Sequence, residues 1–214
     1  MQRIDTDDHI TAGLDALVAA DPRLVAVRAF AGDVPLRRTQ PGFASLASVI
    51  VSQQVSRASA DAIFGRLTAS LTPLTPETVL SAGEAPLIAA GLSRAKQRAL
   101  TAVAEAAGAG ILDLEALCML EADDAVSRMT VIPGIGPWTA EVYLLVSAGH
   151  PDVFPARDVA LQAAVAHAFA LDARPDARAL AAMAESWTPF RAVAARLFWA
   201  YYREMKGREA APLA

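Results

Sequence analysis

A turn rich in glycine and proline stands between two helical patterns at residues 131–145, VIPGIGPWTAEVYLL. Glycine lets the backbone approach a ligand closely, and the first N–H groups of a helix are unpaired donors at the positive end of its dipole. A turn of this kind can therefore bind a phosphate group. Two nucleotide-binding motifs are excluded, because the preceding residues look helical rather than extended and no lysine follows the glycines. The turn could equally be a plain corner between two helices.

A carboxylate follows this turn at a distance of twenty positions from Trp138, where Asp158 stands immediately before the apolar pattern VALQAAVAHAF. Aspartate is a common N-cap, because its side chain accepts hydrogen bonds from the first turn of a helix. The same position keeps the carboxylate ionised and oriented, so that it could stabilise a developing cation or orient a water molecule. Capping and catalysis are compatible roles for Asp158.

Two tryptophans, Trp138 and Trp199, could each pack in a core or stack on a planar ligand, which cation–π attraction would favour for a cationic one. The sequence alone does not bring them together. A catalytic metal is not expected, because His9, His150 and His167 are scattered without ligand spacing. The single cysteine excludes a four-cysteine zinc site and a cysteine-held iron–sulfur cluster.

Helical patterns separated by glycine and proline fill the chain, and β-branched alternation is scarce. We therefore predict an all-α protein. The pattern over 42–69 is long for one helix, and the polar segment SQQVSRAS within it predicts a break or a bend. The basic run SRAKQR, with Arg94, Lys96 and Arg98, is predicted to be a solvated face at a helix start, although it could touch phosphate.

The composition, with 54% hydrophobic residues, indicates a folded protein with a substantial core. We expect a soluble cytoplasmic protein, because no run of eighteen apolar residues is present and the N-terminus does not resemble a signal peptide. The net charge of −4 and the pI of about 5.4 argue against a protein that holds nucleic acid through a large basic face.

Four ordered motifs resemble those of one enzyme family. The turn VIPGIGPWTAEVYLL followed by FPARDVALQ is similar to the signature of the helix-hairpin-helix DNA glycosylases, the HhH-GPD superfamily. Three further segments resemble its 3-methyladenine DNA glycosylase II branch: VIVSQQVS at 49–56, GLSRAKQRAL at 91–100 and SWTPFRAVAARLFW at 186–199. The resemblance covers residues from about 42 to 202.

The resemblance implies the fold, which would be an all-α, two-lobed helical bundle with a helix-hairpin-helix motif. One lobe, residues 33–150, would contain the hairpin. Residues 1–32 and 151–214 would form the second lobe. Asp158 would face the cleft between the lobes and would be the catalytic carboxylate. The pocket for the base would be lined by Trp138, Trp199 and Val142, of which Val142 stands where some members have an aromatic residue.

The resemblance also implies how DNA is bound. Phosphate contacts of the hairpin would come from Gly134, Gly136 and Thr139. Gln54, preceded by Gln53, falls where the family inserts a wedge into the space left by a flipped base, and it is polar where some relatives have an aliphatic residue. A sodium or potassium ion that bridges to DNA would be held by the backbone carbonyls of Thr130, Ile132 and Gly134.

The implied activity is that of a monofunctional DNA glycosylase of base excision repair. It would flip an alkylated base of the 3-methyladenine type out of double-stranded DNA and hydrolyse the N-glycosidic bond, with help from Asp158. Lyase activity is not expected, because members that cut the strand carry a lysine where this chain has Trp138. We expect no catalytic cofactor, no iron–sulfur cluster, and a monomer acting on bacterial-type nucleoid DNA.

Two alternatives remain. The chain could be a non-catalytic helix-hairpin-helix module that binds DNA or senses damage, in which Asp158 is only an N-cap. It could also be a glycosylase for another lesion, such as a deaminated or oxidised base. The spacing of Asp158 from the hairpin and the SQQVS and SWTPF motifs favour catalysis over binding alone.

Overall fold

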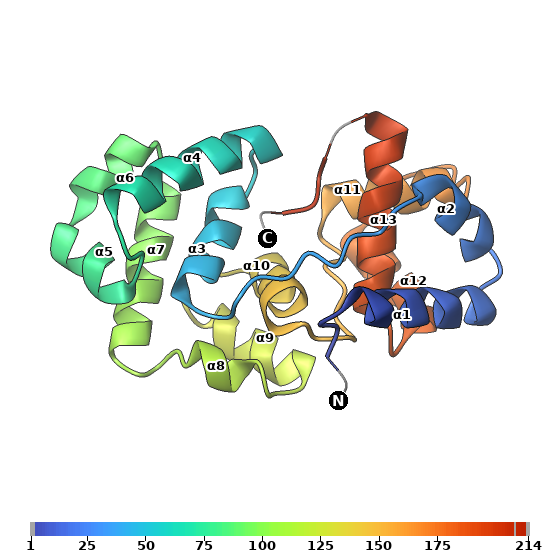
Figure 1. Ribbon diagram of the computed structural model, residues 1–214, viewed down its shortest axis with the longest axis horizontal. Coiled ribbons are helices and arrows are strands. Elements are labelled where there is room, and N and C mark those ends of the chain that lie inside the picture. Colours follow the sequence, from blue (N-terminus) through green and yellow to red (C-terminus); the bar gives the residue numbers. More distant parts are fainter. Residues whose placement is uncertain (1–2, 208, 213–214) are drawn as a thin grey trace. The chain divides into compact units, whose positions relative to one another are not determined.

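The computed structural model describes residues 3–207 and 209–212, and the secondary structure of these residues is helical, without a β-strand (Figure 1). This confirms the predicted all-α class. The chain divides into two compact units. The terminal unit holds the chain up to Arg38 and from Leu144 to Ala211, and the central unit holds Thr39–Tyr143 with Pro212. Within the described residues, no helix is both long and apolar enough to span a lipid bilayer.

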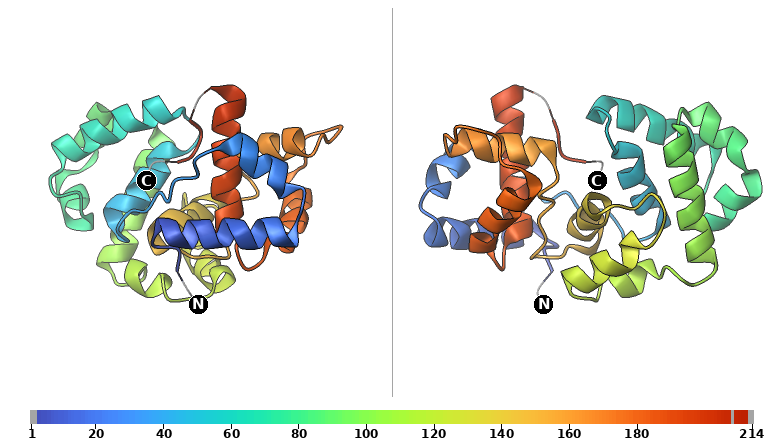
Figure 2. Two further views of the ribbon diagram at one scale, coloured as in Figure 1. Left: turned by 45° about the vertical axis from the view of Figure 1, so that its right-hand side comes forward. Right: turned by 180° about the vertical axis from the view of Figure 1, so that it is seen from behind.

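The terminal unit is built around its last helix, α13, which packs against α1, α2 and α11 (Figure 2). Small residues on these helices allow a close approach: a Cβ atom added at Gly13 of α1 would lie 2.8 Å from Cγ2 of Val193. The helical segments of this unit are α1 (Asp7–Ala20), α2 (Leu24–Ala31), a π-helix (Leu144–Ala148), α11 (Val159–Ala168), α12 (Ala177–Ala184), a 3-10 turn (Glu185–Trp187) and α13 (Arg191–Lys206).

The central unit packs helix α7 against α3, α5 and α6, and α10 against α3 and α9. The long helical pattern over 42–69 is divided as predicted, because α3 ends at Ser52 and α4 begins at Arg57. The helices of this unit are α3 (Phe43–Ser52), α4 (Arg57–Ser70), α5 (Pro76–Ala82), α6 (Glu84–Ala90), α7 (Arg94–Gly108), α8 (Leu114–Leu117), α9 (Ala122–Thr130) and α10 (Pro137–Tyr143).

A buried arginine on α13 connects segments of the terminal unit that are far apart in the sequence. Arg196 is 2% exposed and donates hydrogen bonds to the carbonyls of Leu36 at 2.7 Å, Leu145 at 2.9 Å and Ala192 at 3.1 Å. Burial, together with the nearby charges of Arg38 and Arg37, lowers the pKa of Arg196 to about 9. The guanidinium therefore stays protonated at neutral pH and satisfies three carbonyl groups.

A second arginine, Arg38, also binds carbonyl groups of the π-helix. Arg38 donates to the carbonyl of Val146 at 3.0 Å, to the carbonyl of Ser147, and to the carboxylate of Asp5 at 2.7 Å. The carbonyls at the C-terminal end of a helix carry partial negative charge and lack intrahelical donors. Together with Arg196, Arg38 supplies cationic donors to this end of the π-helix.

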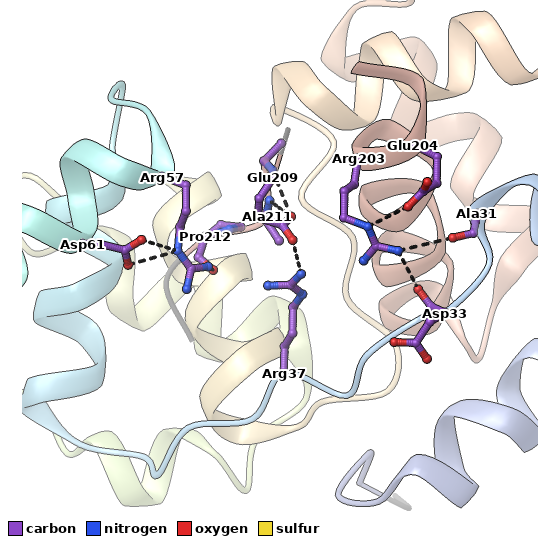
Figure 3. A network of polar contacts seen from close by, with 11 residues as sticks. Ala31, Asp33, Arg37, Arg57, Asp61, Arg203, Glu204, Glu209, Ala211 and Pro212 are labelled. Atoms are coloured by element: carbon purple, nitrogen blue, oxygen red, sulfur yellow. Dashed lines mark hydrogen bonds and ion pairs between the residues drawn. The ribbon is translucent and has the colours of Figure 1, made fainter. Parts of the chain in front are cut away.

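Other arginines of the terminal unit also bind main-chain carbonyls or carboxylates (Figure 3). Arg203 donates to the carbonyls of Ala31 at 3.4 Å and Asp33 at 3.1 Å, and so fastens α13 to the end of α2. Arg37 forms an ion pair with Glu209. Much of the positive charge of this unit is thus engaged within the chain.

We expect Arg196→Met to lower the free energy of unfolding by about 3 kcal/mol or more, because three main-chain carbonyls would lose their donor. Urea unfolding followed by circular dichroism measures the change. Arg178→Met is the matched control, because Arg178 on α12 is exposed and has no polar partner among the described residues. The control should stay within about 0.5 kcal/mol of the wild type. Equal stability of the two variants would contradict the role of Arg196.

Candidate functional site

The glycine- and proline-rich turn is a helical hairpin, formed by α9, residues 131–136 (the hairpin turn) and α10. Inside the hairpin turn, the N–H of Ile135 donates to the carbonyl of Ile132 at 3.1 Å. The side chains of Ile132 and Ile135 are 6% and 4% exposed and anchor the turn, while Val131 is 71% exposed. The hairpin thus has an anchored underside and a solvent-facing surface, which a ligand could reach.

The two glycines of the hairpin turn have different environments. Gly134 has φ +90°, and a Cβ atom placed there would lie 2.3 Å from Cβ and 2.9 Å from Cα of Ala99 on α7. Only glycine fits this close approach of two backbones. At Gly136, by contrast, an added Cβ would meet nothing within 4 Å. The space beside Gly136 is therefore open, as a contact with a phosphate group requires.

The break between α3 and α4, residues 53–56 (the glutamine turn), places its two glutamines differently. Gln53 is half-buried, and its Nε2 donates to Oγ1 of Thr139 at 2.9 Å and to the carbonyl of Gly134 at 3.3 Å. Gln54 is exposed and has φ +55°, a left-handed conformation that is uncommon outside glycine. The structure therefore brings Gln53, Gly134 and Thr139 together and directs Gln54 to solvent.

Thr139 is 2% exposed, and its hydroxyl accepts the hydrogen bond of Gln53. It lies in the first turn of α10, which begins at Pro137. The N–H groups of a first helical turn have no acceptor within the helix. The hydroxyl is therefore engaged in a hydrogen bond inside the central unit. A phosphate contact from Thr139 would come from its main-chain N–H.

Lys96 binds the end of α3, directly before the glutamine turn. It is 8% exposed, and its Nζ donates to the carbonyl of Val51 in the last turn of α3 at 2.7 Å. Burial lowers the pKa of the Lys96 ammonium group. The prediction that the whole run SRAKQR is a solvated face is therefore wrong for Lys96, although Arg94 and Arg98 are exposed.

The sequence did contain a signal for the burial of Lys96. The buried residues of α7 follow it at positions i+3, i+4 and i+7, namely Ala99, Leu100 and Val103. This spacing is the apolar face of an amphipathic helix, and a long aliphatic stem can lie on such a face while the ammonium group reaches a carbonyl. The position of a lysine in the helical period was therefore more informative than its charge.

Asp158 of the terminal unit is the N-cap of α11 and is 7% exposed. Its Oδ1 accepts hydrogen bonds from the N–H groups of Ala160 at 2.9 Å and Leu161 at 3.1 Å. The main chain before it is held by Gln162, whose Nε2 donates to the carbonyl of Ala156 at 2.9 Å. The carboxylate is therefore oriented by the positive end of a helix and by a braced loop.

The residues predicted to line a base pocket are divided between the units and differ in burial. In the central unit, Trp138 is half-buried and Val142, one turn later on α10, is fully buried. In the terminal unit, Trp199 on α13 is 1% exposed, and its indole N–H has no hydrogen-bond partner among the described residues. A buried indole N–H usually has an acceptor, so Trp199 is a donor that a ligand could satisfy.

Three arginines of the central unit lie in the first turns of α4 and α7. Arg57, at the start of α4, pairs with Asp61 at 3.1 Å and donates to the carbonyl of Pro212 at 2.9 Å (Figure 3). Arg94 and Arg98, one helical turn apart on α7, have no polar partner among the described residues. Both side chains are exposed on the helix whose Ala99 contacts Gly134 of the hairpin turn.

A monovalent cation at the hairpin would be held by main-chain carbonyls. The carbonyl of Ile132 already accepts the N–H of Ile135 at 3.1 Å, and that of Gly134 accepts Nε2 of Gln53 at 3.3 Å. A carbonyl oxygen has a second lone pair and is a suitable ligand for a hard cation, so these two hydrogen bonds leave both oxygens able to bind one. Among the described residues there is no cluster of metal-binding side chains.

Comparisons with known proteins agree with this hairpin. The model of the HhH-GPD superfamily base excision DNA repair protein matches residues 47–190. DNA-3-methyladenine glycosylase 1 of Schizosaccharomyces pombe is 30% identical over 161 residues, which are 73% of this chain and 71% of that protein. The probable bifunctional transcriptional activator/DNA repair enzyme AlkA of Mycobacterium tuberculosis is 32% identical over 207 residues, which are 92% of this chain.

Some of these relatives are much longer than this chain. It spans 40% of the Mycobacterium tuberculosis protein, and 31% of a Bacillus subtilis relative that is 34% identical over 90 residues.

Solved structures share the fold over nearly the whole chain. Schizosaccharomyces pombe 3-methyladenine DNA glycosylase (Mag1), in complex with abasic DNA, matches with a TM-score of 0.79 and 26% identity, covering 90% of this chain and 95% of that one. DNA-3-methyladenine glycosidase from Bacillus halodurans matches with a TM-score of 0.76 and 29% identity, covering 96% and 93%. The region matched by the family model includes the glutamine turn, the hairpin and Asp158. The chain therefore belongs to the HhH-GPD superfamily of base excision DNA repair proteins.

Proposed function

We propose that this protein is a monofunctional DNA glycosylase that removes alkylated bases of the 3-methyladenine type from double-stranded DNA. The observation that carries the proposal is Asp158, a nearly buried carboxylate held by two main-chain N–H groups in a member of a base excision repair superfamily. The names of the relatives in Schizosaccharomyces pombe and Bacillus halodurans support the choice of substrate.

In this proposal, Asp158 acts on the sugar. A base inside a duplex must be turned out of the stack before an enzyme can reach its glycosidic bond, and weakened pairing makes this easier. An alkylated purine carries positive charge and is already a good leaving group. As its bond to C1′ breaks, the bonding electrons leave with the base, and the Asp158 carboxylate stabilises the oxocarbenium-like sugar and assists the attack of water. The products are a free base and an abasic site.

Each tryptophan could contact the flipped base in this scheme. The faces of Trp138 and Trp199 would attract a cationic base more strongly than a neutral one. The buried indole N–H of Trp199, which lacks an acceptor among the described residues, would gain one from the ligand. Val142 is smaller than an aromatic residue at the same position, which would leave more room for a substituted base.

The hairpin would bind the DNA backbone without a large basic face. The open surface at Gly136 and the main-chain N–H groups that follow it would contact a phosphate, helped by a cation on the carbonyls of Thr130, Ile132 and Gly134. Such a contact is compatible with the net charge of −4. Exposed Arg94 and Arg98 would add long-range attraction, which salt would weaken.

We expect Asp158→Asn to reduce the release of 3-methyladenine from methylated duplex DNA by about 100-fold or more, because the charge that stabilises the sugar cation is lost. Asparagine is also a good N-cap, so α11 should stay intact. Chromatography of the released bases and the melting temperature measure the two effects.

Asp176→Asn is the matched control for this change, because Asp176 caps α12 of the same unit in the same way, accepting the N–H of Ala179 at 2.8 Å. It should leave base release unchanged. Equal release by wild type and Asp158→Asn would refute the assigned role of Asp158. DNA binding by a wild-type protein that releases no base from any damaged duplex would instead support a non-catalytic module.

The two hairpin glycines should respond differently to alanine. Gly136→Ala should weaken DNA binding several-fold with stability within about 0.5 kcal/mol of wild type, because its Cβ enters open space where the phosphate would lie. Gly134→Ala should lower the free energy of unfolding by about 2 kcal/mol or more, because of its positive φ and the contact with Ala99. Fluorescence anisotropy with labelled duplex and thermal unfolding test the pair. Unchanged DNA binding by Gly136→Ala would count against the phosphate contact.

The proposal also includes the absence of lyase activity. Strand cleavage by this superfamily's lyases needs an amine that forms a Schiff base with the sugar. This chain has only two lysines, of which Lys96 is buried against the carbonyl of Val51 and Lys206 ends α13.

We therefore expect that sodium borohydride, added to the protein with abasic-site duplex, traps no covalent protein–DNA adduct on a denaturing gel. A known lyase of the superfamily is the positive control for trapping. A trapped adduct would contradict the monofunctional assignment, and its loss or persistence in Lys206→Arg would show whether Lys206 supplies the amine.

A further inference from the structure

Gln54 has a left-handed backbone conformation, which no polar contact of its own side chain explains. Its φ of +55° costs a residue other than glycine about 1 kcal/mol or more, and the side chain is exposed with no polar partner among the described residues. Such a conformation persists only where neighbouring residues hold it in place. The contacts that fix the glutamine turn are therefore the determinants of where Gln54 points.

The main chain is fixed on both sides of Gln54. Before it, Nζ of Lys96 donates to the carbonyl of Val51 at 2.7 Å, and the N–H of Gln53 donates to the carbonyl of Ile50 at 3.2 Å. After it, Ser56 caps α4, accepting the N–H of Ser59 at 3.2 Å. These contacts hold the ends of the glutamine turn, but they do not connect it to the hairpin.

The side chain of Gln53 makes that connection. Its Nε2 reaches Oγ1 of Thr139 at 2.9 Å and the carbonyl of Gly134 at 3.3 Å, so one amide group contacts both the hairpin turn and α10. Thr139 is 2% exposed, and Gly134 rests on the backbone of α7. The amide thus joins the glutamine turn to a buried hydroxyl of α10 and to the main chain of the hairpin turn.

Helix α7 completes a triangle of contacts. Lys96 holds the end of α3, and Ala99, three residues later on the same helix, supports Gly134 of the hairpin turn. Gln53 closes the third side between the two turns. Neither turn can shift relative to the other without the loss of a short hydrogen bond or of a close backbone contact.

We infer that Gln53 is a positioning residue, which locks the turn carrying Gln54 to the hairpin so that both meet the DNA in a fixed register. This inference rests on the proposed function, in which Gln54 enters the space left by the flipped base. Gln53 then acts through Gln54 rather than by its own contact with DNA. The hydrogen bonds of the Gln53 amide couple the insertion of Gln54 to the contact between the hairpin and a phosphate.

A double-mutant cycle tests the inference with binding as the readout, independently of which base is excised. The ligand is a duplex with a tetrahydrofuran abasic analogue. Gln53→Met and Gln54→Ala should each weaken binding by about 3- to 10-fold, the usual loss for one hydrogen bond. If Gln53 acts through Gln54, the double variant should bind within about twofold of Gln54→Ala alone, because the second change removes what the first had positioned.

Gln97→Met is the matched control. Gln97 is a half-buried glutamine of the same unit, but its Nε2 closes a local contact with the carbonyl of Leu92 at 2.6 Å and does not reach either turn. Gln97→Met should bind the abasic duplex as wild type does. If Gln53→Met does not fold, Thr139→Val removes the acceptor from the other side and should give the same non-additivity with Gln54→Ala.

A second readout follows the wedge directly. A 2-aminopurine next to the abasic analogue brightens when it is unstacked, so wild type and Gln97→Met should raise its fluorescence, whereas Gln53→Met and Gln54→Ala should not. Multiplicative effects of Gln53→Met and Gln54→Ala, or a Gln53→Met variant that matches Gln97→Met, would overturn the inference and leave the proposed function intact. A wild type that does not prefer the abasic duplex over an undamaged one would overturn both.

Discussion

The central unit depends on the close approach of the hairpin backbone to helix α7. Gly134 lies so near Ala99 that no side chain could be added between them, and the positive φ of Gly134 is what turns the chain at this point. Because the hairpin rests on α7, the start of α10 and the hydroxyl of Thr139 are fixed with respect to that helix. Lys96 on the same helix then fixes the end of α3. One helix is therefore the common reference for both turns of the proposed DNA-binding surface.

Several features could be predicted from the sequence because their determinants are local. Glycine and proline indicated the turn of the hairpin, and the polar segment SQQVSRAS indicated the break between α3 and α4. Asp158 was correctly predicted to be the N-cap of a helix. Each depends on a few consecutive residues and on rules of turn and cap formation. The roles of the site residues in binding and catalysis remain predictions.

The contacts that the sequence did not reveal are long-range. Gln53 and Thr139 are 86 positions apart, and Arg196 binds carbonyls that are 160 and 51 positions away. Every residue has the same main-chain carbonyl, whatever its side chain. No pattern of side chains therefore indicates that an arginine or a lysine will bind one. This is why Lys96 was assigned to a solvated face on charge, although its helical period placed it with buried residues.

The structure of the terminal unit depends on the number of residues in the π-helix at Leu144–Ala148. Each residue of a regular α-helix advances the direction of the side chains and carbonyls by about 100°. A π-helical turn accommodates one residue more than an α-helical turn, so loss of a single residue there would restore the α-helical period. The carbonyls that Arg38 and Arg196 bind would then point elsewhere. Substitutions in this stretch can be judged by size and polarity, but an insertion or deletion changes the phase of the helix itself.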